Sequence, residues 1–232
     1  MSARGLHAIV VADGERPRRQ LLDRAWPGWD ADAGYVVAAD GGARTAGALG
    51  LRLDAVVGDL DSLGEDAAAA LRHEGVEVRR APAAKDETDT ELAIVDAVGR
   101  GAARVTIVGA LGGPRVDHAL ANVTLLAHPA LDGRSAVIVD PRARLSLLTA
   151  RHDGRPIERR LPGADGGVVS LIPIGGDAGG VTTAGLRYPL ADEDLPLGTP
   201  RGVSNVRAGP LASVTLRRGR LLIVEVAATL DR

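Results

Sequence analysis

The 232-residue chain contains no cysteine and no phenylalanine, and Lys85 is its single lysine. Without cysteine it can form neither a disulfide framework nor a thiolate metal site, which fits a cytoplasmic protein. The aromatic residues are only Trp26, Trp29, Tyr35 and Tyr188. The core must therefore be built from aliphatic side chains.

Long apolar runs and an excess of charge of one sign are also missing. The apolar stretch at 6–12 ends at Asp13 and is too short for a secretory hydrophobic region or a membrane span. A formal net charge of -2 argues against a general nucleic-acid or membrane-surface binder. We therefore expect a globular protein that binds neither nucleic acid nor membrane.

The pattern of apolar segments changes near residue 140. Before it, short apolar runs alternate with helical patterns, which predicts an α/β domain with a mainly parallel sheet over 1–140. After it, prolines and glycines separate short apolar segments, which predicts an all-β domain over 141–232, a sandwich or a small barrel. The expected strands of the first domain are 6–12, 35–39, 55–57, 76–78, 104–108 and 136–139. Its expected helices are 43–49, 65–73, 88–98 and 117–127.

Two of these helices have capping signals. Thr88 opens a capping-box pattern in which Glu91 should reach back to the helix start. Asp117 should cap the last helix. The residues of that helix expected to face inward are Leu120, Val123 and Leu126.

Acidic residues gather in three short blocks, 58–62, 85–89 and 115–118. Two like charges about 4 Å apart repel by roughly 4 kcal/mol at an effective dielectric of about 20, so we expect a hard divalent cation among them. Such cations with carboxylate ligands usually serve phosphate chemistry. Asp59 and Asp61 follow an expected strand, where residues two apart point the same way. The alternative is a turn in which they cap backbone amides.

Other features near these blocks suit phosphate. The glycine-rich loop 109–115 joins a strand to a helix, where backbone N–H groups can approach an anion, although it is neither a Walker A nor a dinucleotide fingerprint. Arg115 can clamp a phosphate in bidentate fashion. Asp86 and Asp89 lie at the mouth of a helix, where acidic residues are often only partners of the helix dipole. Lys85 beside them could hold a phosphate oxygen.

Taken in order, these blocks resemble the thiamine pyrophosphokinase (thiamine diphosphokinase) family. The similar segments are 40–43, 57–62, 85–93, 109–118, 170–173, 180–183, 185–190 and 202–205. The resemblance implies an α/β nucleotide-binding domain and a β-sandwich that binds thiamine and dimerises. It implies transfer of a diphosphoryl group from ATP to the hydroxyl of thiamine with release of AMP, Mg²⁺ as the cofactor, and a homodimer.

The resemblance also implies roles for individual residues. The carboxylates expected to bind magnesium and act in catalysis are Asp59, Asp61 and Asp89, and Asp117 completes the catalytic set. The residues expected to bind ATP are Asp40, Gly41, Lys85, Asp86, Thr88 and Arg115. The residues expected to bind thiamine are Ser204 and Asn205.

The thiamine pocket of the family often has an aromatic wall, and none lies next to Ser204 in the sequence. Tyr188, Arg207 or aliphatic groups are the candidates for contact with the ring. Two other functions stay open. One is a catalytically silent relative that binds nucleotide and acts as an interaction or regulatory protein. The other is a pyrophosphokinase for another hydroxylated heterocycle, such as a pterin.

Overall fold

The computed structural model describes residues 5–228. The chain divides into two compact units, Met1–Pro141 and Arg142–Arg232. None of the helices in the described part of the chain is long and apolar enough to cross a membrane.

The first unit is built on strands that pair with one another in parallel, in the order β6-β5-β1-β2-β3-β4. The mainly parallel sheet predicted from the sequence is confirmed. Its strands are β1 (Leu6–Val11), β2 (Ala33–Ala39), β3 (Ala55–Gly58), β4 (Glu77–Arg80), β5 (Ala102–Val108) and β6 (Ser135–Val139).

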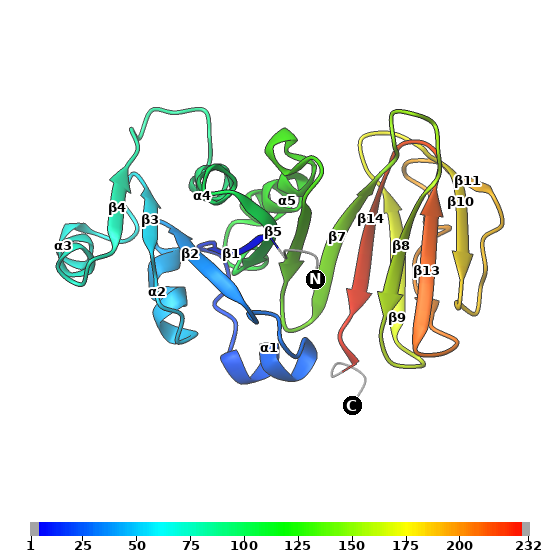
Figure 1. Ribbon diagram of the computed structural model, residues 1–232, viewed down its shortest axis with the longest axis horizontal. Helices are drawn as coiled ribbons and strands as arrows, with labels where there is room; N and C mark the ends of the chain where they lie inside the picture. The colour runs from blue at the N-terminus through cyan, green and yellow to red at the C-terminus, as the bar shows by residue number, and fades with distance from the viewer. Residues whose placement is uncertain (1–4, 229–232) are drawn as a thin grey trace. The chain divides into compact units, whose positions relative to one another are not determined.

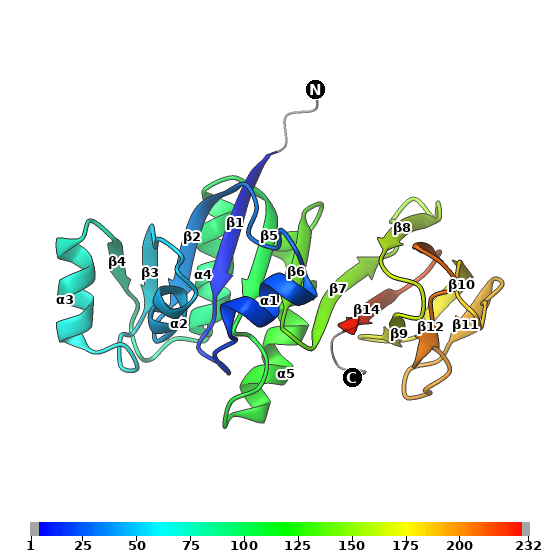
Figure 2. The same ribbon diagram turned by 90° about the horizontal axis from the view of Figure 1, so that it is seen from below.

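Helices cover both faces of this sheet (Figure 1), with α4 (Asp89–Gly99) and α5 (Val116–Thr124) on one face and α1 (Arg19–Ala25) and α2 (Gly42–Ala48) on the other. Figure 2 views the sheet from the side of α1 and α2. The remaining helix, α3 (Glu65–His73), packs beside β4. Because both faces are covered, central strands such as β1 are buried along most of their length and read as continuous apolar runs. Helix α1 was not predicted, since Leu22 is its one buried residue and leaves no periodic signal.

The two predicted helix caps turn out differently. Thr88 caps α4 as expected, because its Oγ1 accepts a hydrogen bond from the backbone N–H of Glu91 at 3.2 Å. The Glu91 side chain does not complete the capping box; its Oε1 lies 3.2 Å from Nε2 of His128. For α5 the prediction is wrong, because Arg115 is the N-cap and Asp117 lies inside the first turn. The carboxylate of Asp117 is bound instead by the Arg115 guanidinium, with Nη2 to Oδ2 at 2.6 Å.

The inward face of α5 also differs from the prediction. Leu120 is 64% exposed, whereas Asn122 is buried. Leu126 is buried as expected, but it belongs to a separate 3-10 turn, η1 (Leu125–Ala127), followed by a second, η2 (Pro129–Leu131). The change of helix type after Thr124 shifts the phase of the apolar stripe, so the regular helical spacing used in the prediction does not apply.

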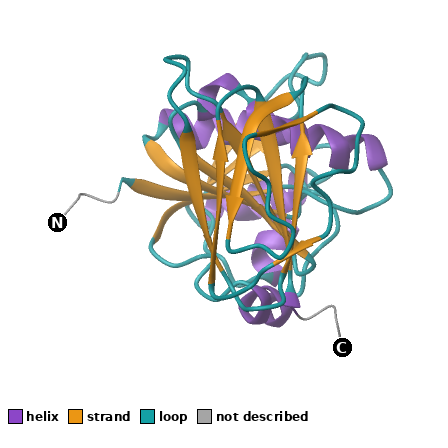
Figure 3. Ribbon diagram, turned by 90° about the vertical axis from the view of Figure 1, so that its right-hand side faces the viewer, coloured by secondary structure: helices purple, strands orange, loops and turns teal. Residues whose placement is uncertain are grey.

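The second unit consists of two antiparallel sheets, whose strands are orange in Figure 3. Their orders are β12-β9-β14-β7 and β11-β10-β13-β8. Leu171 and Ile223 of the first sheet share one apolar core with Leu161 and Val214 of the second, so the predicted sandwich is confirmed. The strands are β7 (Ala143–Thr149), β8 (Ile157–Pro162), β9 (Val168–Pro173), β10 (Ala178–Ala184), β11 (Glu193–Leu195), β12 (Asn205–Val206), β13 (Leu211–Leu216) and β14 (Arg220–Val226).

Candidate active site

A cleft of about 490 Å³ lies in the first unit, lined by residues that directly follow its parallel strands. Asp13 and Gly14 come after β1, Asp40 after β2 and Asp59 after β3. The strand order reverses between β1 and β5, which is where open α/β sheets bind ligands. Backbone hydrogen bonds join the two loops at this point, including Gly14 N–H to the carbonyl of Gly109 at 2.7 Å.

Three carboxylates converge in this cleft. One oxygen from each of Asp40, Asp59 and Asp89 lies within 4.8 Å of the others, and we call these residues the carboxylate trio. They come from the ends of β2 and β3 and from the first residue of α4. Hard divalent cations such as Mg²⁺ prefer carboxylate oxygens, and the donor set of the trio therefore fits such an ion.

Gly58 makes this convergence possible. Its φ is +150°, and a Cβ at this position would lie 2.9 Å from Cβ of Asp40 and 3.1 Å from Cγ of Asp89. A side chain at residue 58 would push the trio apart. The backbone of β3 thus ends on a glycine because two acidic side chains occupy the space beside it.

Asp40 is buried, and both of its oxygens are hydrogen-bonded. They accept the backbone N–H groups of Ser62 at 3.0 Å and Leu63 at 2.8 Å. Burial raises the pKa of the Asp40 carboxyl, and the two N–H groups only partly offset this, since Asp61 and Asp89 act in the same direction as burial. The pKa of Asp61 is lowered, first by its interaction with Asp40.

The ammonium group of Lys85 lies among the same carboxylates. Its Nζ is 2.8 Å from Oδ1 of Asp89 and 4.0 Å from Oδ2 of Asp59, and the side chain is 12% exposed. Burial by itself would lower the pKa of Lys85, but the close contact with Asp89 and its charge, with the charges of Asp59 and Asp40, outweigh it and raise the pKa. Lys85 is thus a charged ammonium that partly neutralises the trio.

Asp61 also lines the cleft but lies outside the trio. The expectation that Asp59 and Asp61 point the same way from an extended segment is wrong, because Leu60 between them has a φ of +67°. The segment is a turn in which the N–H of Asp61 donates to Oδ1 of Asp59 at 3.1 Å. The alternative interpretation, a turn with carboxylates on backbone amides, describes the local geometry.

The other predicted nucleotide-site residues of this unit divide into two groups. Thr88 and Arg115 line the cleft together with the residues already described. Gly41, Asp86 and Asp117 are not among its lining residues. Gly41 is the N-cap of α2 and Asp86 is exposed. The Arg115 guanidinium holds the pKa of Asp117 well below its usual range.

Several lining residues were missed by the sequence predictions. Asp13 follows β1 as Asp40 follows β2, so the position at a strand end was a usable signal. Burial within the cleft raises the pKa of Asp13, against the lowering effect of Arg44. Asn122 carried no such signal; it lies inside α5 and its Nδ2 donates to the carbonyl of Ala110 at 2.9 Å, which anchors the glycine-rich loop.

The predicted thiamine residues, Ser204 and Asn205, lie in the second unit. Ser204 is exposed with a φ of +60°, and its N–H donates to Oγ of Ser170. Asn205 is buried and binds the backbone of Tyr188 at both ends of its amide: Oδ1 accepts the N–H at 3.1 Å, and Nδ2 donates to the carbonyl at 2.6 Å. Asn205 therefore orients the segment that carries the Tyr188 ring, a side chain that is 62% exposed.

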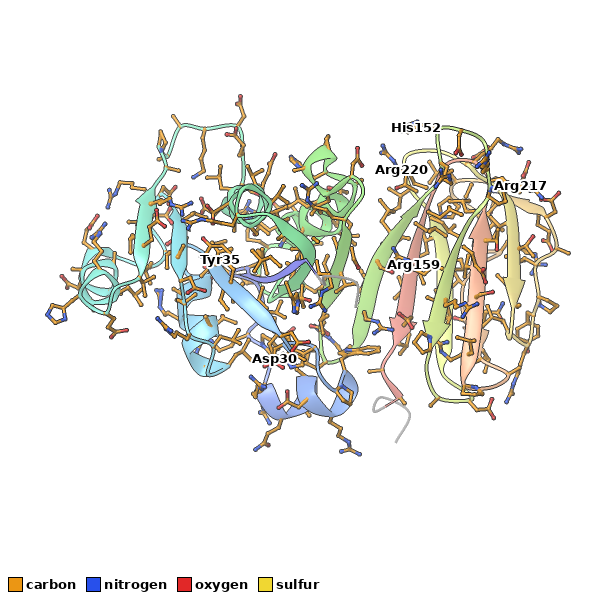
Figure 4. All side chains as sticks on the ribbon, viewed as in Figure 1. Asp30, Tyr35, His152, Arg159, Arg217 and Arg220 are labelled. Carbon is orange, nitrogen blue, oxygen red and sulfur yellow. The ribbon has the colours of Figure 1, made fainter. Side chains whose placement is uncertain are left out.

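Arg207 is sealed inside the second unit. Its Nη2 lies 2.5 Å from Oε1 of Glu225, and the two side chains are 4% and 6% exposed. Arg144 grips the same carboxylate, with Nε to Oε2 at 2.8 Å and Nη2 to Oε1 at 2.9 Å. Arg159, labelled in Figure 4, interacts electrostatically with Glu225, and burial lowers its pKa. The possibility that Arg207 contacts a thiamine ring is wrong, because its guanidinium is bound within this buried network.

Known proteins resemble the chain along most of its length. The family model described as "Thiamin pyrophosphokinase, catalytic domain" matches residues 29–138, and that described as "Thiamin pyrophosphokinase, vitamin B1 binding domain" matches residues 157–221. A thiamine pyrophosphokinase of Bacillus subtilis is 25% identical over 168 residues, 72% of this chain and 75% of the relative.

Two further relatives extend the likeness. Thiamine pyrophosphokinase 1 of Oryza sativa subsp. japonica is 27% identical over 220 residues, 88% of this chain and 81% of the relative. The crystal structure of a thiamin pyrophosphokinase from Geobacillus thermodenitrificans superposes with a TM-score of 0.78 at 27% identity, covering 97% of this chain and 99% of that one.

Proposed function

Because the chain belongs to the thiamin pyrophosphokinase family, we propose that it transfers the diphosphoryl group of ATP to the hydroxyl of thiamine, giving thiamine diphosphate and AMP. The observation that carries this proposal is the convergence of the carboxylate trio in the cleft at the strand ends. Such a set of acidic groups suits a metal-bound nucleotide.

Mg²⁺ is the cofactor that fits, with Asp40, Asp59 and Asp89 as the residues that would hold it. When bound, the ion supplies charge neutralisation to the phosphates. The trio includes Asp40 where the sequence-based prediction had Asp61. Asp61, which lines the same cleft, would stand near this ion as a further acidic group.

The residues of the chain would act mainly by position and charge. The thiamine hydroxyl would attack the β-phosphorus of ATP in line, and the bond to the α-phosphate oxygen would break, so that AMP leaves. Lys85 and Arg115 provide positive charge beside the phosphates, and the loop carrying Gly112 and Gly113 lines the same cleft. Preorganised groups of this kind supply most of the rate in phosphoryl transfer.

Thiamine would contact the second unit through Tyr188. Its ring is exposed, and Asn205 fixes the backbone that carries it. An aromatic face attracts a cationic ring such as the thiazolium of thiamine. Ser204 would contribute its exposed hydroxyl, and Asn205 would act by positioning Tyr188.

We also propose a cytoplasmic homodimer. Among its described residues, the second unit exposes five large apolar side chains, which would gain from burial between two copies. They are Ile172, Tyr188, Leu197, Val203 and Leu211. Sedimentation velocity at micromolar concentration checks this point: a species of one chain only would contradict the dimer.

Product analysis tests the proposed reaction. The purified chain is incubated with thiamine and Mg-ATP, and the products are identified by mass spectrometry. We expect thiamine diphosphate and AMP in equal amounts. ADP as the only nucleotide product, or AMP without thiamine diphosphate, would contradict the proposal.

Two controls separate the alternatives. A hydroxymethyl pterin replaces thiamine in a parallel reaction, and its preferential use would identify a pyrophosphokinase for another heterocycle. Nucleotide binding measured by calorimetry, without turnover of any acceptor, would identify a silent relative.

A further inference from the structure

Lys85 and a divalent cation would use the same carboxylates. The ammonium of Lys85 lies 2.8 Å from Oδ1 of Asp89 and 4.0 Å from Oδ2 of Asp59. Both carboxylates belong to the trio that fits a metal. An ammonium and a divalent cation repel each other, so the two cannot both bind these carboxylates at full strength.

We propose that Lys85 is an exchangeable counter-cation of the carboxylate trio, which weakens the binding of free metal and transfers to the phosphates when the metal–nucleotide complex enters. Lys85 is the right chemical type for this exchange. Its ammonium is a compact charge on a flexible four-carbon stem, whereas an arginine would hold a carboxylate through a rigid two-pronged contact. The inference rests on the proposed function for one point, namely that the trio binds the metal of the ATP complex.

The surroundings of Lys85 support the exchange. Oδ1 of Asp89 is buried and has no hydrogen-bond partner among the described residues, so the ammonium 2.8 Å away is its compensating charge. Lys85 itself lines the cleft, in a loop just ahead of α4, and its partner at i+4 is the first residue of that helix. A short rotation of the side chain can therefore carry the ammonium from the carboxylates toward the open cleft while the backbone stays in place.

The exchange gives the site a defined order of binding. Free metal must displace the ammonium, and nothing then compensates the displaced charge. A metal–nucleotide complex brings phosphate oxygens that accept Lys85 as it leaves the carboxylates. The lysine therefore favours metal that arrives with its nucleotide over metal alone.

The test measures metal binding rather than turnover. Mn²⁺ binding to the nucleotide-free protein is followed by electron paramagnetic resonance in the wild type, Lys85→Met and Lys85→Arg. Removing the competing charge should raise the affinity of Lys85→Met for Mn²⁺ by about tenfold, and Lys85→Arg, which keeps the charge, should gain less than about threefold. Arg115→Gln is the matched control, because it removes a positive charge from the same cleft outside the trio; it should gain less than about threefold as well.

In a second measurement, Lys85→Met should change the affinity in the opposite direction. The complex of Mn²⁺ with α,β-methylene-ATP, whose bridging carbon blocks the bond that the proposed reaction breaks, should bind Lys85→Met more weakly than wild type by at least about fivefold, because a charged contact to phosphate is lost. A merely structural role of Lys85 would weaken both kinds of binding. Thermal unfolding shows whether each variant is folded, and Lys85→Gln replaces Lys85→Met if the latter is not.

Three outcomes would overturn the inference. They are an unchanged or lower Mn²⁺ affinity in Lys85→Met, an equal gain in Arg115→Gln, and the absence of Mn²⁺ binding in every variant. The proposed reaction is judged separately by its products. If no thiamine diphosphate forms while Lys85→Met still binds Mn²⁺ more tightly, the reaction fails and the counter-cation role stands.

Discussion

The two units hold their charged clusters in opposite ways. In the β unit, Glu225 is buried and bound by two arginines, and its oxygens are fully used within the protein. In the α/β unit, Asp59 and Asp89 lie in an open cleft with one flexible lysine as their compensating cation. A cluster whose negative charge is neutralised by neighbouring arginines stabilises the fold. A cluster with more carboxylates than nearby cations can bind a positively charged ligand. The same residue types therefore carry different functions, and the difference lies in what surrounds them.

The largest effect that tests this comparison is expected in the β unit. Glu225→Gln leaves the buried Arg207 guanidinium without its negative partner, and loss of one member of a buried pair costs about 3–5 kcal/mol. Urea unfolding measures the free energy of unfolding. Glu193→Gln, which breaks an exposed pair with Arg201 in the same unit, is the matched control and should cost less than about 1 kcal/mol. Equal losses in free energy of unfolding in the two variants would mean that the buried network stabilises the fold no more than an exposed ion pair does.

Replacing a carboxylate by an amide in the cleft should leave the stability of the protein unchanged and remove its activity. Asp89→Asn takes one carboxylate from the trio, and we expect kcat to fall at least about a hundredfold, the scale of losing one preorganised electrostatic group. The melting temperature should stay the same or rise, since repulsion within the trio is relieved. Asp86→Asn, three residues away and outside the cleft, is the control. A comparable loss in this control would support the nucleotide-binding role predicted for Asp86.

A smaller effect is expected at the exposed aromatic of the β unit. Tyr188→Ala should raise KM for thiamine by roughly fivefold, which corresponds to about 1 kcal/mol for one cation–π contact. Tyr188→Phe keeps the ring and should behave like wild type. Steady-state kinetics with thiamine varied at saturating Mg-ATP gives both values. If both variants are normal, the ring of thiamine packs elsewhere.

The smallest effect concerns the two exposed ion pairs of Glu77. Arg79 and Arg100 lower the pKa of Glu77 from 4.5 to about 2. Since the pKa is lower in the folded state, these pairs stabilise the fold fully above pH 4.5, and their contribution is lost as the pH falls through about 2. The melting temperature of Glu77→Gln should therefore lie slightly below that of wild type at pH 7, and the two should converge as the pH approaches 2. Because the ion pairs of Glu77 are exposed, 1 M salt should remove most of the difference in melting temperature between the two proteins at pH 7.

The apolar runs and helical patterns of the sequence were sufficient to predict the parallel sheet and the sandwich. The three acidic blocks were sufficient to predict the acidic character of the site. The sheet and the sandwich follow from burial, which local sequence records directly: a strand covered on both faces reads as a continuous apolar run, as in β1. The N-cap at Thr88 could also be predicted from the sequence, because a cap needs only residues that are neighbours in the chain.

The composition of the trio was decided by tertiary structure. Asp40 joins Asp59 and Asp89 because the ends of β2 and β3 are adjacent in the sheet and Gly58 leaves space between them, and no local pattern records either fact. The positive φ of Leu60 turns Asp61 out of the trio, against the two-residue period of a strand. Arg207 was likewise a candidate for contact with thiamine in the sequence, but the fold buries it against Glu225. Sequence determines which side chains are present and which elements they join, while the distances between side chains from different elements depend on how those elements pack.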